Sequence, residues 1–320
     1  MATIVQYSRL GGPDVLEVVE VPTPEVSDGQ VLVEVQAIGV NPIDSKLRSG
    51  KRPTPPIDAP RRVGSDASGV VLEVGSGVDG WAAGDEVIVQ GATGAYASHL
   101  VLEPSTLVRK PSVWTWSQAA AVGIPVSTAY QALRSLGVGE GTRLLIHGGT
   151  GGVGQAAVQF AVAWGATVFA TASPSNHARL AELGAVPLSY GDGLVERVRE
   201  AAPDGIDVVL DGAGTDEALE GSLDLVTDRS RIGTIVAGAR AAELGIRAWS
   251  GGARFRSPTR NCGCAPTEFP RRSSSLRRDG SRSRSRSGSR WLAPLPRSAS
   301  AKKGTPGGRS SSFHDRSEFN

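Results

Sequence analysis

Five glycines fall within seven residues of this chain, at positions 148, 149, 151, 152 and 154. An apolar run at 144–146 precedes them, helical apolar spacing follows over 155–164, and a second apolar run begins at 167. A diphosphate needs this order of strand, glycine turn and helix, because glycines let the backbone approach it and the helix start attracts negative charge. The spacing Gly149-x-Gly151-x-x-Gly154 in this context predicts a dinucleotide site. The alternative, a turn that serves only the fold, leaves so many clustered glycines unexplained.

Two different element patterns surround that turn, one in residues 1–122 and one in residues 123–252. In the first, β-branched runs between Gly, Pro and Asp residues predict a compact, barrel-like β domain with a short helix at 42–48. Its strands are expected at 2–6, 15–19, 30–39, 69–74, 86–90 and 96–102.

In the second range, strands alternate with helices, which predicts a parallel sheet with helices on both faces. Its strands are expected at 144–146, 167–171, 186–189, 206–210, 231–236 and 245–250. The chain's further helices are expected at 119–122 after Ser117, 127–135, 155–164, 177–183 after Ser175, 193–201 and 215–226. A ligand is expected at the carboxyl ends of the strands, in the turns 148–154, 171–175, 211–214 and 236–239.

Length and cysteine content bound the class of protein. A chain of 320 residues is long enough for two domains, and it has no apolar run that could span a membrane and no signal-peptide pattern. Its two cysteines, Cys262 and Cys264, do not suggest a disulfide-built secreted protein. We therefore expect a soluble cytoplasmic protein with no membrane partner.

The last part of the chain, residues 253–320, departs from the rest in charge and pattern. It holds 16 Lys and Arg against 4 Asp and Glu, whereas residues 1–252 hold 18 against 28, and its run 281–290 spells SRSRSRSGSR. We expect an aberrant, disordered basic tail outside the fold. Three interpretations stay open: an Arg/Ser segment that binds RNA phosphates, a plain disordered tail, or a shift of reading frame around 252–261. One set of codons that encodes residues 300–315 can also be translated in a shifted reading frame. That translation contains Gly-Lys-Ile-Val-Leu and reaches a stop codon shortly afterwards, as the end of a folded chain would, which favours the frameshift hypothesis.

Further short motifs accompany the glycine turn in a fixed order. They are Gly39-Val-Asn41-Pro-Ile-Asp44 with Arg48-Ser-Gly50, Gly64-Ser-Asp66-Ala-Ser-Gly69, Gly84-Asp85-Glu86-Val87 and Gly123-Ile-Pro-Val-Ser-Thr128-Ala-Tyr130. Together with 143–154 they make residues 1–252 resemble the medium-chain dehydrogenase/reductase superfamily, and within it the zinc-free quinone oxidoreductases and polyketide-type enoyl reductases. The resemblance implies an α/β fold class, with a GroES-like β-barrel N-terminal domain plus a doubly wound Rossmann domain.

The resemblance also bears on metal binding. Zinc alcohol dehydrogenases of the superfamily carry a cysteine where Asn41 stands and a histidine where Ser65 stands, and amide or hydroxyl oxygens are poor zinc ligands. The four-cysteine structural zinc loop of those relatives has no counterpart in this sequence, and the Cys262-Gly-Cys264 pair has no second ligand pair. His99 and His147 also lack partners in the sequence. We therefore expect structural roles for both histidines and no metal site.

The expected absence of zinc restricts the reaction class. Alcohol oxidation would lose its Lewis acid, which leaves hydride delivery from a reduced nicotinamide to a quinone or an α,β-unsaturated carbonyl. The resemblance implies that Asn41 and Asp44 lie near the nicotinamide ribose with Lys46 and Arg48 nearby. We take Asn41, Asp44 and Arg48 as candidate catalytic residues. A helix-capping pair is the alternative role for Asn41 and Asp44, and the proton donor stays open because Lys46 stands where some relatives have tyrosine.

The end of the second strand in the glycine-turn unit indicates which nicotinamide cofactor is bound. An NAD site places Asp or Glu there to hold ribose hydroxyls, whereas this chain has Thr171-Ala172-Ser173-Pro174. Hydroxyls together with the Arg179 guanidinium suit a 2′-phosphate, so we expect NADPH rather than NADH. The expected cofactor contacts are Thr128, Gly149, Thr150, Gly151, Gly152, Val153, Gly154, Ser173, Arg179, Tyr190, Ala213 and Ala237.

The favoured interpretation is an NADPH-dependent oxidoreductase that acts on a small quinone or enone. Two alternatives stay open: a truncated product that binds the cofactor without turnover, and an RNA-binding protein that uses the basic tail. We do not expect nucleic acid as a partner of the favoured form. The segment 245–250 resembles the edge strand with which these enzymes pair subunits, so we expect a homodimer for a chain with the family's usual C-terminus.

Overall fold

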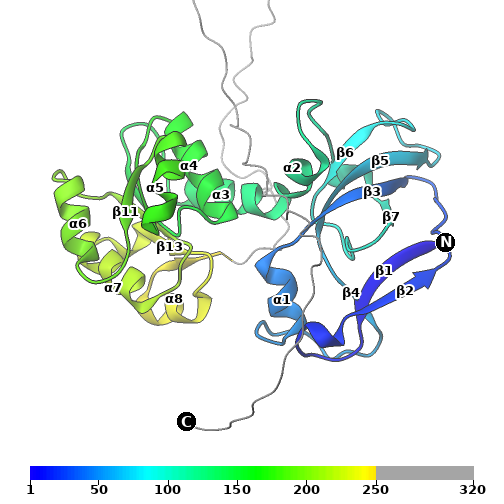
Figure 1. The fold of residues 1–320 in the computed structure, drawn as a ribbon, viewed down its shortest axis with the longest axis horizontal. Coiled ribbons are helices and arrows are strands. Elements are labelled where there is room, and N and C mark those ends of the chain that lie inside the picture. Colours follow the sequence, from blue (N-terminus) through cyan, green and yellow to red (C-terminus); the bar gives the residue numbers. More distant parts are fainter. Residues whose placement is uncertain (250–320) are drawn as a thin grey trace, which may run out of the picture. The chain divides into compact units, whose positions relative to one another are not determined.

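The computed structural model describes residues 1–249. The predictions made for 250–320, which include the basic tail and the frameshift, lie outside the described residues. In the described part of the chain, no helix is long and apolar enough to cross a membrane. A β-rich part comes first along the sequence, and an α/β part follows it (Figure 1).

The β-rich part, drawn in blue to cyan in Figure 1, is built from antiparallel strands. They are β1 (Ala2–Tyr7), β2 (Glu17–Val21), β3 (Val31–Gly39), β4 (Arg61–Arg62), β5 (Asp66–Val74), β6 (Glu86–Val89), β7 (His99–Leu102) and β8 (Leu107–Arg109). Three of them form a sheet in the order β2-β1-β4, and five form a sheet in the order β7-β3-β5-β6-β8. Helix α1 (Pro42–Arg48) follows β3, and α2 (Trp116–Ala120) follows β8.

The core of this part comes from alternate residues along its strands. Val31 and Val33 of β3, and Val87 and Val89 of β6, are fully buried in one apolar cluster. A period of two residues places such side chains on the same face of a strand, and each fully buried valine contributes about 1.5–3 kcal/mol. The β domain that the β-branched runs predicted is therefore confirmed.

The α/β part contains one parallel sheet of six strands in the order β11-β10-β9-β12-β13-β14. The strands are β9 (Arg143–His147), β10 (Thr167–Ala172), β11 (Val186–Ser189), β12 (Val208–Asp211), β13 (Ile232–Thr234) and β14 (Arg247–Ala248). The strand order reverses between β9 and β12, and in such sheets ligands bind outside the carboxyl ends of the strands at this reversal. The doubly wound Rossmann fold is confirmed.

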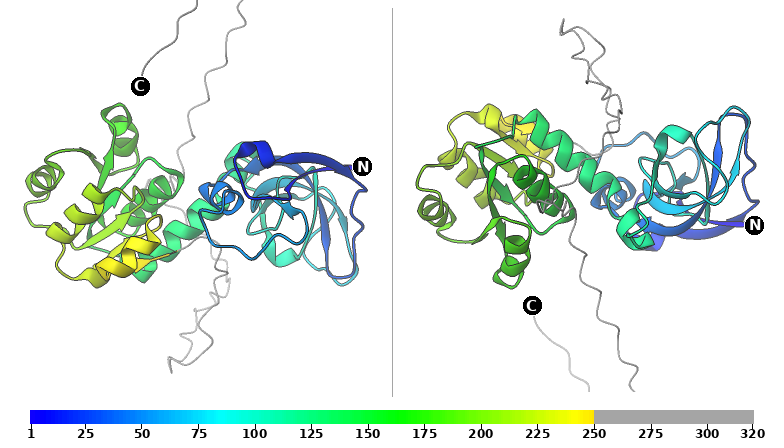
Figure 2. Two further views of the ribbon diagram at one scale, coloured as in Figure 1. Left: turned by 90° about the horizontal axis from the view of Figure 1, so that it is seen from below. Right: turned by 90° about the horizontal axis from the view of Figure 1, so that it is seen from above.

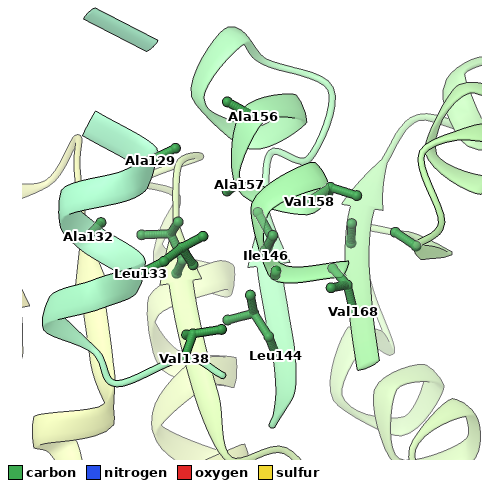
Figure 3. Packing of buried hydrophobic residues seen from close by; sticks show 14 of the residues in the cluster. Ala129, Ala132, Leu133, Val138, Leu144, Ile146, Ala156, Ala157, Val158 and Val168 are labelled. Carbon is green, nitrogen blue, oxygen red and sulfur yellow. The ribbon is translucent and has the colours of Figure 1, made fainter. Parts of the chain in front are cut away.

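Helices cover both faces of this sheet, as the views in Figure 2 show. They are α3 (Gly123–Ser135), α4 (Gly152–Ala163), α5 (His177–Glu182), α6 (Leu194–Ala201), α7 (Asp216–Leu225) and α8 (Gly238–Leu244). On one face, Leu144 and Ile146 of β9 pack with Leu133 of α3 and with α4 (Figure 3). On the other face, Leu145 of β9 and Phe169 of β10 pack with residues of α6, α7 and α8. Successive residues of β9 thus belong to two different apolar cores, one on each face of the sheet.

Helices α2, α3 and α4 begin earlier than predicted, α4 at Gly152 rather than at 155, and local contacts explain the first two. Helix α2 begins at Trp116 rather than at 119, because Thr115 and not Ser117 is its N-cap. Gln118 N donates to Thr115 Oγ1 (3.2 Å), and Thr115 N donates to Gln118 Oε1 (2.9 Å), which is a capping box. Helix α3 begins at Gly123 rather than at 127, with Pro125 in its first turn, where a missing N–H costs little.

Other boundaries differ where turns or short strands were not recognised. The second strand is β2 at Glu17–Val21 rather than 15–19, because Pro13–Val15 forms a 3₁₀ turn whose Val15 packs with Tyr7. A 3₁₀ turn at Pro174–Asn176 precedes α5, so Ser175 is not its cap. The sequence did not predict β4, β8 or α8, and β14 has two residues in place of the expected strand over 245–250. The proposed domain boundary at 122 stays a prediction.

Candidate functional site

The glycine turn lies between the end of β9 and the start of α4. Gly148 follows β9 with a φ of 75°, a left-handed backbone that glycine adopts without strain. Thr171 of β10 holds the turn, because its Oγ1 accepts from Gly148 N (3.2 Å) and its carbonyl oxygen accepts from Gly149 N (2.9 Å). The backbone of the turn is thus fixed against the neighbouring strand.

Close packing accounts for some of the clustered glycines and not for others. A Cβ at Gly154 would lie 2.3 Å from the carbonyl oxygen of Gly148, and one at Gly149 would lie 2.8 Å from Ala170 Cβ. A Cβ at Gly151 would have the Gly148 carbonyl oxygen as its nearest neighbour, at an ordinary contact distance of 3.4 Å. The fold itself requires glycine at 148, 149 and 154. Gly151 is exposed, and its backbone is accessible to a ligand.

The first turn of α4 presents backbone amides at the carboxyl edge of the sheet. Gly151 is the N-cap of this 12-residue helix, and the first amides of a helix have no acceptor within the helix. Among the other expected contacts, Gly152 and Val153 form this first turn, and the Thr150 carbonyl accepts from Gln155 Nε2 (2.9 Å). The helix dipole and the amides together suit a diphosphate.

The carboxyl end of β10 carries a small cluster of hydroxyl and amide groups. Ser173 Oγ accepts from Asn176 Nδ2 (2.9 Å) and lies 3.1 Å from Ser175 Oγ. Tyr190, which follows β11 in the neighbouring position of the sheet, exposes 60% of its surface. The structure therefore brings the predicted contact Ser173 together with the Ser175 hydroxyl, at the strand end where an NAD site would place an acid.

Arg179 of α5 lies near the glycine turn but is already partnered. Its Nε donates to Gln155 Oε1 (3.1 Å), and its Nη1 pairs with Glu182 at 3.1 Å. The guanidinium is thus connected to α4, while Glu182 remains largely exposed. Because the Glu182 carboxylate is solvated, the guanidinium can exchange it for a phosphate.

Three further expected contacts lie on α3 and in the turns after β12 and β13. Thr128 is 8% exposed on α3, which packs against α4. Ala213 N donates to Asp211 Oδ1 (2.9 Å), and Ala237 N donates to Thr234 Oγ1 (3.1 Å). Both turns follow the sheet at the same carboxyl edge as the glycine turn.

His147, the last residue of β9, is 1% exposed and has a structural environment. Ser222 Oγ donates to the Ala218 carbonyl (2.5 Å), so at 3.2 Å it accepts from His147 Nε2, which therefore carries the proton. His147 Nδ1 has no hydrogen-bond partner. Burial lowers the pKa of His147 to about 4, against a smaller opposing effect of Asp211. The imidazole is neutral at physiological pH.

Asn41 and Asp44 lie at the start of α1, and their side chains have different partners. Asp44 Oδ2 accepts from Asn41 N (2.9 Å), which caps the helix as the alternative interpretation proposed. The Asn41 side chain also has a partner outside the helix, because its Nδ2 donates to Asp66 Oδ2 (2.9 Å) of β5. Helix capping therefore accounts for the Asp44 carboxylate, and Asp66 holds the nitrogen of the Asn41 amide.

Asp66 is a buried carboxylate that the sequence did not single out as a site residue. It is 1% exposed, and its Oδ2 also accepts from Ile124 N (2.7 Å) in the first turn of α3. A Cβ at Gly123 would lie 2.2 Å from its Oδ1, so glycine at 123 makes room for the acid. Burial raises the pKa of Asp66, while the hydrogen bonds from Ile124 and Asn41 oppose that shift.

Tyr96 and Arg48 complete the surroundings of α1. Tyr96 Oη donates to Asp44 Oδ2 (3.1 Å), and burial raises the pKa of the Tyr96 phenol. Burial likewise raises the pKa of Asp44. Arg48 Nε donates to the Gly11 carbonyl (3.3 Å), so the structure places this candidate catalytic residue against the loop after β1. Asp66 belongs to one of the sequence motifs and Tyr96 to none. Neither residue was predicted as part of the site, because no rule of sequence spacing connects them to α1.

The donor chemistry around Asn41 bears on the question of zinc. Its amide is held with nitrogen toward Asp66, and amides are poor zinc ligands. Within residues 1–249, no group of three or more His, Cys, Asp and Glu side chains has a geometry that could hold a metal ion.

Comparisons with known proteins match both parts of the chain. The family described as alcohol dehydrogenase GroES-like domain matches residues 27–112, and the family described as zinc-binding dehydrogenase matches residues 152–248. Quinone oxidoreductase 1 of Escherichia coli is 36% identical over 236 residues, which cover 72% of this chain and 71% of that protein. The human quinone oxidoreductase is 39% identical over 173 residues, and the chain spans only about half (52%) of its length.

A solved structure agrees with these relatives. The crystal structure of Escherichia coli quinone oxidoreductase complexed with NADPH superposes with a TM-score of 0.66 at 30% identity. The match covers 77% of this chain and 80% of that chain. It includes both the β-rich and the α/β parts, because neither part alone makes up that share of the sequence.

The packing of the glycine turn predicts unequal effects of two alanine substitutions. Gly154→Ala should lower the free energy of unfolding by about 1–3 kcal/mol, because the new methyl group clashes with the Gly148 carbonyl. Gly151→Ala should cost less than about 1 kcal/mol, because its methyl has room and only the N-cap preference changes. Urea unfolding followed by circular dichroism measures both. Equal losses in the two variants would contradict the steric account.

The buried neutral His147 predicts a loss of stability in mild acid. Its folded-state pKa lies below the ordinary 6.5, so the unfolded chain binds a proton that the folded chain does not, and stability falls as the pH drops from about 6.5 to 4. The slope is at most about 1.4 kcal/mol per pH unit for one proton. Asp44 and Asp66, with raised pKa values, act in the opposite direction and are unchanged in the variants.

His147→Gln keeps a donor toward Ser222 and should flatten this pH dependence relative to the wild type. Urea midpoints measured from pH 7 to pH 4.5 make the comparison. A His147→Gln variant with an unchanged slope would show that this imidazole does not titrate as its burial requires.

Proposed function

The chain belongs to the medium-chain dehydrogenase/reductase superfamily and to its quinone oxidoreductase type, and on that premise we propose that it is an NADPH-dependent oxidoreductase. It would deliver hydride to a quinone or an α,β-unsaturated carbonyl without zinc. The observation that carries this proposal is the glycine turn, where Gly151 is open beside the first-turn amides of α4.

The residues of the turn fit a dinucleotide. The fold's own packing does not require glycine at 151, and the absence of a side chain there lets a ligand approach the backbone at the start of α4. The NADPH complex of the Escherichia coli relative supports the same cofactor for this chain. A bound reduced nicotinamide supplies the hydride.

NADPH is favoured over NADH by the side chains at the end of β10. Ser173 and Ser175 place two hydroxyls within 3.1 Å of each other, and no carboxylate stands in the segment 171–175 to repel a 2′-phosphate. Arg179, held by Gln155, can add its guanidinium when Glu182 releases it. Tyr190 would contribute its exposed ring at the neighbouring strand end.

The substrate side suits an acceptor that is already electrophilic. The bond from Nδ2 to Asp66 fixes the Asn41 amide, and its oxygen has a second lone pair that can accept from a ribose hydroxyl. Reduction of a quinone adds one hydride and one proton and yields the hydroquinone, and reduction of an enone adds the same pair across the C=C bond. The protein therefore orients the reactants and supplies hydrogen bonds to the oxygen on which charge develops.

For a chain with the family's usual C-terminus, the proposed assembly is a homodimer in the cytoplasm. Strand β14 lies at the edge of the six-stranded sheet, which is where a second subunit could pair by extending the sheet. Comparison with relatives supports a small-molecule substrate.

Cofactor oxidation assays test the proposed function. The full chain should oxidise NADPH in the presence of 1,4-benzoquinone or an enone, with a kcat/KM at least about tenfold higher than with NADH. Arg179→Gln should lower kcat/KM for NADPH several-fold and leave that for NADH unchanged, because only NADPH carries the 2′-phosphate. Arg199→Gln, an exposed arginine of α6, is the matched control and should change neither value.

Two outcomes would contradict these expectations. Equal or better efficiency with NADH would overturn the cofactor preference. NADPH binding without turnover on any quinone or enone would favour the cofactor-binding, inactive interpretation.

A further inference from the structure

Three neighbouring strands of the parallel sheet end in a row of polar residues. His147 of β9 is in register with Asp211 of β12, and Asp211 is in register with Thr234 of β13. All three are at most 1% exposed. Burying a polar group costs free energy unless the group is hydrogen-bonded, so the hydrogen-bond partners of these three residues indicate their structural role.

The Asp211 carboxylate holds the turn that follows its own strand. Its Oδ1 accepts from Ala213 N (2.9 Å) and from Gly214 N (2.8 Å), and Gly214 takes a left-handed backbone with φ of 71°. Its Oδ2 accepts from Thr234 Oγ1 (2.7 Å) on the next strand. One carboxylate therefore joins the turn after β12 to strand β13.

The Thr234 hydroxyl is a hydrogen-bond donor and a hydrogen-bond acceptor at the same time. It donates to Asp211 Oδ2, and it accepts from Val236 N (3.2 Å) and Ala237 N (3.1 Å) in the turn after β13. The pairing of β12 with β13 is made by their backbones and does not need this hydroxyl. What the hydroxyl adds is a connection between the two turns that carry Ala213 and Ala237.

The same edge is connected to the glycine turn through backbone groups. Gly212 N donates to the His147 carbonyl oxygen (2.9 Å), directly before Gly148. A Cβ at Gly148 would lie 3.2 Å from the Gly212 carbonyl oxygen, so the two turns touch. The three turns after β9, β12 and β13 thus form one connected surface at the strand ends.

We propose that Thr234 is a positioning residue for the dinucleotide, because its hydroxyl locks the turns after β12 and β13 in one arrangement through Asp211. The inference rests on the proposed function, since it assumes that NADPH lies on these turns. Without the hydroxyl, the buried Asp211 Oδ2 and the amides of Val236 and Ala237 lose a partner, and the turns no longer share one geometry. Thr234 does not need to touch the cofactor for this effect.

Substitution of Thr234 in the full chain tests the proposal. Thr234→Val keeps the shape and removes the hydroxyl, and it should raise the Kd for NADPH about tenfold, as measured by isothermal titration calorimetry. In turnover, KM for NADPH should rise while KM for the quinone stays within about twofold. Thr234→Ser keeps the hydroxyl and should bind NADPH within about twofold of the wild type.

Thr142→Val is the matched control at the opposite end of the sheet. Thr142 Oγ1 accepts from Gly139 N (3.1 Å) just before β9, so this variant also loses a threonine hydroxyl bond. Its Kd for NADPH should equal that of the wild type even where its stability falls. If Thr142→Val weakens NADPH binding as much as Thr234→Val does, the effect is general destabilisation and the proposal fails.

A measurement on the wild type covers the case in which Thr234→Val does not fold. NADPH should slow amide hydrogen exchange in peptides spanning 212–215 and 235–238 together, because one hydroxyl joins these turns. Protection of one turn without the other would overturn the proposal while the proposed function stands, as would an unchanged Kd in Thr234→Val. A wild type that binds no NADPH would overturn both.

Discussion

The contact between the first turn of α4 and the end of β9 is the constraint on which the rest of the site depends. A Cβ at Gly154 would come within 2.3 Å of the Gly148 carbonyl oxygen, so the helix can begin directly against the strand only with glycine there. This contact places the α4 amides at the carboxyl edge of the sheet. Next to this contact, α3 packs against α4 through small buried residues such as Ala129, Ala132 and Ala157 (Figure 3).

Two buried carboxylates then fix the backbone around this helix pair. Asp66 accepts from Ile124 N at the start of α3 and from the Asn41 amide, and Asp211 accepts from the two amides of the turn after β12. Removing a carboxylate from water is costly, and backbone amides offset that cost while their own positions become fixed. In both places a buried acid decides where neighbouring amide groups lie.

The sequence predicted the parts of this protein in which one short segment decides the structure. The βαβ unit was predictable because strand, turn and helix follow one another and five glycines mark the turn. The missed parts depend on contacts between distant segments, as with the bond from Asn41 to Asp66 and the two-residue strand β4, which exists only through its pairing with β1. The Thr115–Gln118 capping box was a local signal, and it was overlooked in favour of Ser117. Helix α8 offered only a short run after a glycine, with no side-chain cap.

A crystal structure of the full chain with NADPH tests the central claim most directly, which is that a dinucleotide lies on the amides of α4. We expect the pyrophosphate oxygens within hydrogen-bond distance of the amides of Gly152 and Val153, and the 2′-phosphate beside Ser173. A pyrophosphate bound elsewhere, or no cofactor density at the strand ends in crystals saturated with NADPH, would contradict the account.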